Sequence, residues 1–208
     1  MTTFIPSPAA LAFAELSLSA RDTLAEQRSV YSGAESRLDW AGERWELTIS
    51  TPPSRWDAAA EIEAWADRLR AGDAVARIRL DLSMPRRGTT AAATVTVSGA
   101  HTAGGRSLAV TGLGASATLL AGSLIADPDR RLHRLRASVT ANGSGAATLD
   151  LFPRLRAAYS GGQAWRLAGG DGVVGNFRLQ NRPGHVFAFG ERGGVIGGKT
   201  LQFVEAFL

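Results

Sequence analysis

Few side chains in this sequence have a type and spacing that could carry out catalysis. A glycoside hydrolase needs two carboxylates that flank the cleaved bond, and the arginine-rich residues 83–170 contain only Asp127, Asp129 and Asp150. Asp127 and Asp129 flank Pro128, and this short segment lacks the further oxygen ligands of a calcium loop. We therefore expect a turn at Pro128, and we do not expect the protein to be an enzyme.

Metal and thiol chemistry find little support either. The chain has no cysteine, which excludes disulfides, thiolate nucleophiles and thiolate zinc sites, and is typical of proteins assembled in a reducing cytoplasm. His101, His133 and His185 are far apart in sequence, whereas structural metal sites usually present ligands in close pairs. We expect ordinary surface or turn histidines, with neither a metal nor a cofactor.

One glycine-rich segment matches a nucleotide-binding pattern on paper. Residues 112–117, GLGASA, fit the relaxed dinucleotide fingerprint, which functions only when a strand precedes it and a full helix follows. Gly122 and Pro128 leave no room for that helix. The segment therefore predicts a turn.

Arginines form the one marked cluster of charge. A basic cluster can bind nucleic acid, but no aromatic residues alternate with these arginines to stack on bases, so nucleic acid is not an expected partner. A solvated face or a face for a protein partner is the preferred interpretation. The six residues are Arg130, Arg131, Arg134, Arg136, Arg154 and Arg156.

Charge is distributed unevenly along the 208 residues. Residues 1–82 carry nine arginines and thirteen acidic residues, a net charge of −4, whereas residues 83–170 carry ten arginines and three aspartates, a net charge of +7. The remainder carries +1, which gives the overall +4. Such a shift predicts a separate module in the middle of the chain.

The middle module has the pattern of a small all-β domain. Short β-type runs alternate with glycine-rich turns, and Asn142-Gly143-Ser144-Gly145 is a strong hairpin signal. This spacing predicts a small barrel or a sandwich, inserted as residues 83–170. The six runs are ATVTVSG, RSLAVTG, TLLAGSLI, LHRLRASV, AATLDLF and QAWRLA.

The flanking segments, residues 1–82 and 171–208, predict one β-rich domain with a single long helix at 55–71. Strict alternation in residues 44–50 (RWELTIS) predicts a half-buried strand, and Pro52-Pro53 ends it. Ser54 and Asp57 fit a capping box, Gly72 fits the C′ position, and an apolar stripe lies between them. The stripe consists of Ile62, Trp65, Ala66 and Leu69.

Further strands are expected at Val30-Tyr31 and 186–189, and at 200–207, where Leu201, Phe203 and Phe207 share a face. Overall, the sequence predicts a mainly β fold, in which a β-sandwich or sheet domain carries an inserted barrel or sandwich. No apolar run reaches the ~20 residues that a membrane span requires, so no membrane span is expected.

Three stretches together resemble the distal tail protein, a minor tail protein family of long-tailed, siphovirus-type bacteriophages and prophages. The first is SVYSG at 29–33, followed by Asp39-Trp40 and by TPP before the helix. The second is RLHRL at 131–135 running into ANGSGAATLD at 141–150, and the third is FPRLR at 152–156. The glycine-rich residues 190–198 depart from the family pattern.

The resemblance implies a structural virion protein without catalytic activity. Such a protein forms a homo-oligomeric, usually hexameric, ring at the distal end of the tail, assembled in the host cytoplasm. Its expected partners are further copies of itself, the tail tube protein and the tail hub or tip proteins. The alternative is a receptor- or carbohydrate-binding tail-tip module, for which the middle domain offers Trp165, Tyr159 and Phe152 as aromatic residues.

Overall fold

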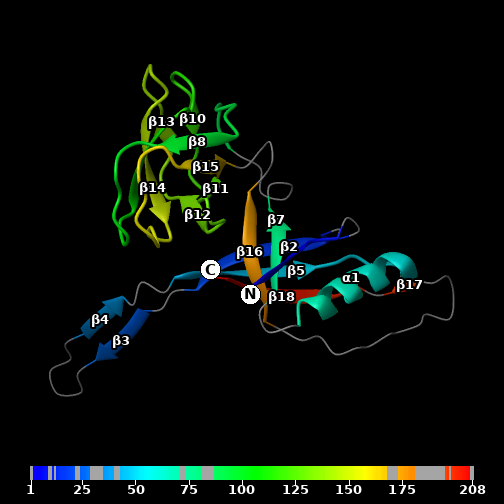
Figure 1. Cartoon of the computed structure of the whole chain (residues 1–208). Coiled ribbons are helices and arrows are strands. Elements are labelled where there is room, and N and C mark those ends of the chain that lie inside the picture. The colour runs from blue at the N-terminus through cyan, green and yellow to red at the C-terminus, as the bar shows by residue number, and fades with distance from the viewer. Residues whose placement is uncertain are drawn as a thin grey trace.

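The computed structural model describes residues 2–8, 11, 13–21, 24–28, 35–39, 43–70, 74–80, 87–167, 173–180, 195–196 and 198–206. Within them the fold is mainly β, with one helix, and this confirms the fold class predicted from the sequence. Two larger assemblies stand out, a six-stranded sheet and a closed barrel (Figure 1).

The six-stranded sheet combines strands from both ends of the chain. Its order is β1-β7-β16-β18-β5-β2, and only the β1–β7 pairing is parallel. In this order the strands are Thr3–Pro6, Ala74–Arg79, Val174–Leu179, Thr200–Glu205, Arg44–Ser50 and Glu15–Arg21.

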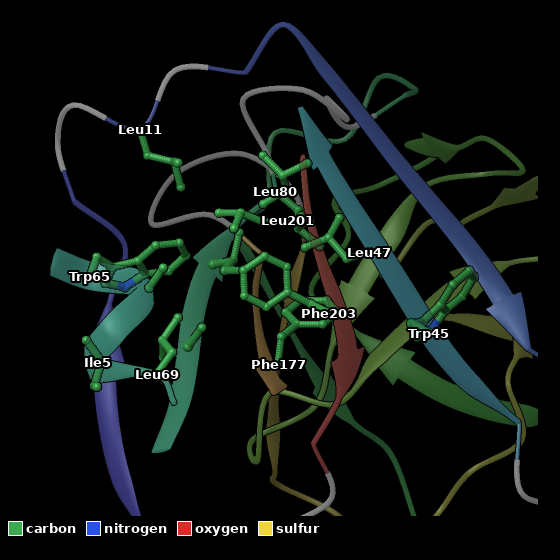
Figure 2. Close-up of a cluster of buried hydrophobic side chains, with 14 of the residues drawn as sticks. Ile5, Leu11, Trp45, Leu47, Trp65, Leu69, Leu80, Phe177, Leu201 and Phe203 are labelled. Atoms are coloured by element: carbon green, nitrogen blue, oxygen red, sulfur yellow. The ribbon is translucent and has the colours of Figure 1, made fainter. Parts of the chain in front are cut away.

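One face of the sheet is apolar because the side chains of each strand alternate between its two faces. On β5, Trp45, Leu47 and Ile49 are buried, as the alternation predicted. Leu201 and Phe203 on β18 are buried beside them, in register with Ile49 and Leu47 (Figure 2).

Helix α1 (Trp56–Arg68) adds its apolar stripe to this core. Ile62, Trp65, Ala66 and Leu69 are all buried, as predicted, and the Trp65 ring lies 5.8 Å from that of Phe203 (Figure 2). Burial of this stripe in the core, rather than a side-chain cap at the N-terminus, therefore holds α1 in place.

The helix begins later and ends earlier than the predicted 55–71, and the predicted capping box is wrong. Arg55 is the N-cap residue and makes no side-chain cap hydrogen bond. Ser54 instead belongs to the short strand β6 (Ser54–Arg55), which pairs with β17 (Val195–Ile196). Leu69 is the C-cap, and Gly72 lies outside the described residues.

The middle of the chain forms a closed six-stranded barrel, which decides between the two predicted architectures. Alternate residues of its strands, such as Leu108 and Val110 or Leu149 and Leu151, fill a second core. In order around the barrel the strands are β11 (Leu124–Ala126), β12 (Leu132–Leu135), β14 (Ala147–Phe152), β9 (Ser107–Thr111), β8 (Thr94–Val97) and β15 (Ala164–Leu167).

Turns in the barrel fall where glycine and asparagine predicted them. The Gly145 amide donates to the Asn142 carbonyl at 3.0 Å, and this turn leads into β14. Residues 112–117 form a turn rather than a helix start. A small pair, β10 (Thr118–Leu119) with β13 (Val139–Thr140), lies outside the barrel order.

The barrel lies between β7 and β16 in sequence, and these two strands are neighbours in the sheet. The division into 1–82 plus 171–208 and 83–170 stays a prediction, and its junctions at 81–86 and 168–172 are outside the described residues. So are the strands expected at Val30-Tyr31 and 186–189, together with Phe207.

A hairpin formed by β3 (Leu24–Arg28) and β4 (Glu35–Asp39) extends away from both the sheet and the barrel (Figure 1). It follows the pairing of β2 with β5, in which Arg21 lies opposite Arg44. The sheet therefore has an edge strand, β2, whose neighbouring chain projects outward.

Candidate protein-interaction face

The six arginines of the predicted partner face come from three places near the junction of sheet and barrel. Arg130 and Arg131 lie in the turn between β11 and β12, and Arg134 and Arg136 lie on and after β12. Arg154 and Arg156 follow β14. Only Arg134 and Arg136 are exposed, and the other four are partly buried.

Arg156 belongs to an ion pair inside the junction. Its guanidinium lies 2.8 Å from Oε2 of Glu205, whose side chain is fully buried at the end of β18. Burial raises the pKa of Glu205, while Arg156 and two backbone amides oppose that rise. Arg156 therefore neutralises a buried carboxylate, a use in which loss of one partner is costly.

Glu205 also joins the two assemblies through the backbone. Its Oε1 accepts a hydrogen bond from the Leu132 amide of the barrel at 2.9 Å, and its Oε2 accepts one from the Trp45 amide at 3.2 Å. The Trp45 indole in turn donates to the Leu132 carbonyl at 2.9 Å. These three bonds set the position of β12 relative to β5 and β18.

Glu43, which directly precedes β5, connects the same parts a second time. Its carboxylate accepts from Arg106 at 3.3 Å and from the Arg154 amide at 3.2 Å, and its carbonyl accepts from Arg156 at 2.6 Å. Beside it lies a cavity of about 360 Å³. Its lining consists of Glu43, Ala103, Gly104, Arg131, Pro153, Arg154, Leu155 and Arg156.

Arg131 is also used within the chain. It lies 3.6 Å from Asp127 and 3.3 Å from Asp129. Asp127 is buried and accepts from the Tyr159 hydroxyl at 2.6 Å and from the Arg131 amide at 2.7 Å. Burial raises the pKa of both Asp127 and Tyr159. The hydrogen bonds and ion pairs of this cluster hold the turn between β11 and β12 in place.

Arg134 and Arg136 remain as the exposed part of the predicted face. The Arg134 guanidinium lies 5.6 Å from the centre of the Trp45 ring, and Arg136 pairs with Asp150 at 3.3 Å. Because an exposed ion pair contributes only about 0–1 kcal/mol and a cation–π contact of an exposed arginine about 0.5–1 kcal/mol, both arginines can exchange their present contacts for those of a partner.

The expectation of surface or turn histidines is wrong for His133. Its ring is fully buried, stacks 5.1 Å from Trp165 and has Nδ1 3.0 Å from the Pro153 carbonyl. Burial lowers the pKa of His133 to about 4. His101 Nε2 lies 3.1 Å from the Ser98 carbonyl and 3.2 Å from the Ala109 amide, and its tautomer decides which of the two hydrogen bonds it makes. His185 lies outside the described residues.

The residues weighed for other functions are largely committed to packing. Trp165 and Tyr159, considered for sugar binding, are buried in the barrel core. Asp127, Asp129 and Asp150 each pair with an arginine. Across the described ranges no group of histidine and acidic residues could hold a metal ion, and no helix there is long and apolar enough to cross a membrane.

Comparison of the chain with protein-family models and with curated proteins finds no match.

Sequence reasoning missed the two glutamates that join sheet and barrel. A signal for Glu205 was present, because it has the same parity as Leu201 and Phe203 and so lies on the buried face of β18. A charge at a core position predicts a buried partner of opposite charge. Nothing in the sequence indicated that this partner is Arg156.

Proposed function

We propose that the protein is a structural component of a bacteriophage virion that forms a ring at the distal end of the tail. In this role it joins the tail tube to the proteins of the tail hub or tip. The resemblance to distal tail proteins motivates the proposal, and one structural observation supports it best. This observation is the open strand edge at β2, from which the β3–β4 hairpin projects.

An edge strand presents backbone donors and acceptors that another chain can pair with. In the described part of the chain β2 pairs only with β5. A closed ring satisfies one such edge per subunit without continuing into a fibre. The projecting hairpin offers further backbone surface to a neighbouring subunit, and six-fold closure is part of the proposal.

A ring subunit must also hold its shape under load, and the junction between sheet and barrel suits that requirement. Glu205 and Glu43 connect β5, β12, β18 and the segment after β14 through buried or partly buried hydrogen bonds. The exposed Arg134 and Arg136 on the barrel are thereby held in a fixed position relative to the sheet. There they can contact an acidic surface of a neighbour.

The first test is the location of the protein. The bacterium that carries this coding sequence is induced to release particles, and the tagged protein is located by electron microscopy. We expect label at the far end of the tail. Absence of the protein from purified particles contradicts the proposal, whereas glycan binding by the isolated protein without incorporation supports the receptor-binding alternative.

The second test removes the hairpin. Deletion of residues 24–40 leaves Asp22, Thr23, Ala41, Gly42 and Glu43 to connect the paired ends of β2 and β5. We expect a folded chain that no longer enters particles. The double variant Arg134→Glu/Arg136→Glu reverses the charge of the proposed contact and should slow or block assembly while each subunit stays folded. Assembly of the wild-type chain, measured by light scattering, should weaken as salt screens exposed charges.

A further inference from the structure

A second cleft lies between the β1–β7 edge of the sheet and the turn that joins β11 to β12. Its volume is about 240 Å³, below the roughly 300–1,000 Å³ of typical small-molecule pockets, so it suits a single side chain. Its lining consists of Phe4, Arg77, Pro128, Asp129, Arg130 and Asn176.

The cleft has an excess of positive charge. Arg77 and Arg130 line it, and burial together with the charges of Arg77 and Arg166 lowers the pKa of Arg130. Asp129 also lines the cleft, but its carboxylate pairs with Arg131 at 3.3 Å. Within the part of the chain that the structure describes, no ion pair joins a carboxylate to Arg77, Arg130 or Arg166, and guanidinium groups clustered in this way favour a bound anion.

Phe4 and Arg77 form a preorganised wall of the cleft. The Arg77 guanidinium stacks 3.9 Å from the centre of the Phe4 ring, and among the described residues Phe4 is one of two large apolar side chains that stay exposed. Stacking occupies the face of the guanidinium and leaves its N–H groups, which lie in the plane, available to an acceptor. Phe4 also offers an apolar surface to the carbon atoms of a ligand.

Asn176 supplies an acceptor in the same place. It is buried, and its Nδ2 donates to the Asp129 carbonyl at 3.0 Å. A carbonyl can only accept, so this bond fixes which end of the amide is nitrogen. Oδ1 is buried and has no hydrogen-bond partner among the described residues, a situation that is costly until a donor arrives.

We propose that this cleft binds a carboxylate carried by a segment of another protein, either an acidic side chain or a chain end. Arg77 and Arg130 donate hydrogen bonds to the carboxylate oxygens, and Asn176 Oδ1 accepts one from a peptide N–H beside it. Phe4 covers the aliphatic carbons. The inference goes beyond the proposed ring and holds whether or not the chain assembles into one.

The probe is acetyl-glutamate methylamide, which carries one carboxylate and flanking peptide N–H groups, titrated into the full chain. Chemical shifts of the Asn176 side-chain amide and of the Arg77 and Arg130 Nε–H groups report binding. We expect saturable shifts at all three residues. Acetyl-glutamine methylamide, which lacks the charge, and inorganic phosphate, which lacks a peptide N–H, should each bind at least about tenfold more weakly.

The double variant Arg77→Gln/Arg130→Asn removes both guanidinium groups and their charge, and asparagine tolerates the positive φ of 66° at position 130. It should weaken binding of the glutamate probe at least about tenfold. The matched control is Arg55→Gln/Arg68→Gln, which removes the same charge from exposed positions outside the cleft and should leave binding unchanged.

Four results overturn the proposal. They are the absence of saturable shifts, equal binding of the glutamine probe, equal loss in the control variant, and tighter binding of phosphate than of the glutamate probe. The last would make the cleft a site for inorganic anions. Circular dichroism of both double variants confirms that a loss of binding is not a loss of fold.

Discussion

The barrel and the sheet reach their cores by different routes. The barrel uses one continuous stretch, from Thr94 in β8 to Leu167 in β15. The sheet instead collects six separate segments, and its β1 and β18 come from opposite ends of the chain. The chain must close long loops before the sheet gains its contacts, whereas most barrel pairings are nearer in sequence.

A buried pair of opposite charges lies where the sheet and the barrel meet. Glu205 is in the last strand of the sheet, and it accepts a hydrogen bond from the barrel amide of Leu132. Its counter-charge, Arg156, comes from the barrel side. The junction is therefore complete only when both assemblies are folded, and the comparison predicts that damage to the sheet and to the barrel can be told apart.

The largest effect is expected from the sheet core. Trp65→Ala removes a buried ring that packs on Phe203 and should lower the free energy of unfolding by about 3–5 kcal/mol. Amide exchange should rise mainly in the strands of the sheet and less in the barrel, because most barrel side chains fill a separate cluster and it is mainly β11 and β12 that add residues to the sheet core. Chemical denaturation and hydrogen exchange provide the two measurements.

Equal loss of protection in both regions would show that the sheet and the barrel do not unfold separately, and a change below about 1 kcal/mol would show that Trp65 is not a core residue.

Limited proteolysis of the wild-type chain tests the same division. Cleavage is expected first near Arg86-Arg87 or at residues 166–172, and the flanking fragments should stay associated. Early cleavage within residues 44–70 would contradict the predicted domain plan.

The next effect concerns the junction itself. Arg156→Leu leaves the buried Glu205 without its counter-charge and should cost about 3 kcal/mol at pH 7. Adding Glu205→Gln should recover part of this loss, because a neutral amide replaces the uncompensated charge. Arg136→Leu is the matched control, since its pair with Asp150 is exposed and should contribute at most about 1 kcal/mol.

Denaturation of the single and double variants measures these costs. If Arg156→Leu proves as mild as Arg136→Leu, the junction is not the shared element that the geometry indicates.

A third effect belongs to the barrel alone and depends on pH. The pKa of His133 is about 4 in the folded chain, whereas an ordinary histidine, as in the unfolded chain, has a pKa of 6.5. Between these two pH values the unfolded chain takes up a proton at His133 and the folded chain does not. Stability is therefore lost as pH falls from 6.5 to 4, by about 3 kcal/mol at most. Raised pKa values of Asp127 and Glu205 act in the opposite direction.

The comparison with His133→Asn isolates this contribution, because asparagine can still donate to the Pro153 carbonyl but does not titrate. Denaturation of both proteins across this pH range should give a steeper acid loss for the wild type. Parallel curves would show that His133 does not titrate differently on folding.

Much of the local structure could be predicted from the sequence. Alternation placed Trp45, Leu47 and Ile49 on one buried face, the 3.6-residue period selected the buried stripe of α1, and the Asn142–Gly145 turn was evident from its residue types. These features depend on neighbours within a few residues, so each segment carries its own information. The parity of Glu205 even marked a buried charge.

Only the tertiary structure decided which strands pair and what the charges face. Four of the six clustered arginines are partly buried. Arg156 pairs with Glu205, which is distant in the chain, and Arg131 pairs with the buried Asp127. The cleft at Arg77 and Arg130 likewise exists only because β7 packs beside the β11–β12 turn. The alternation within β18 could mark Glu205 as buried, but its partner Arg156 is remote in sequence, and no local pattern identifies such a partner.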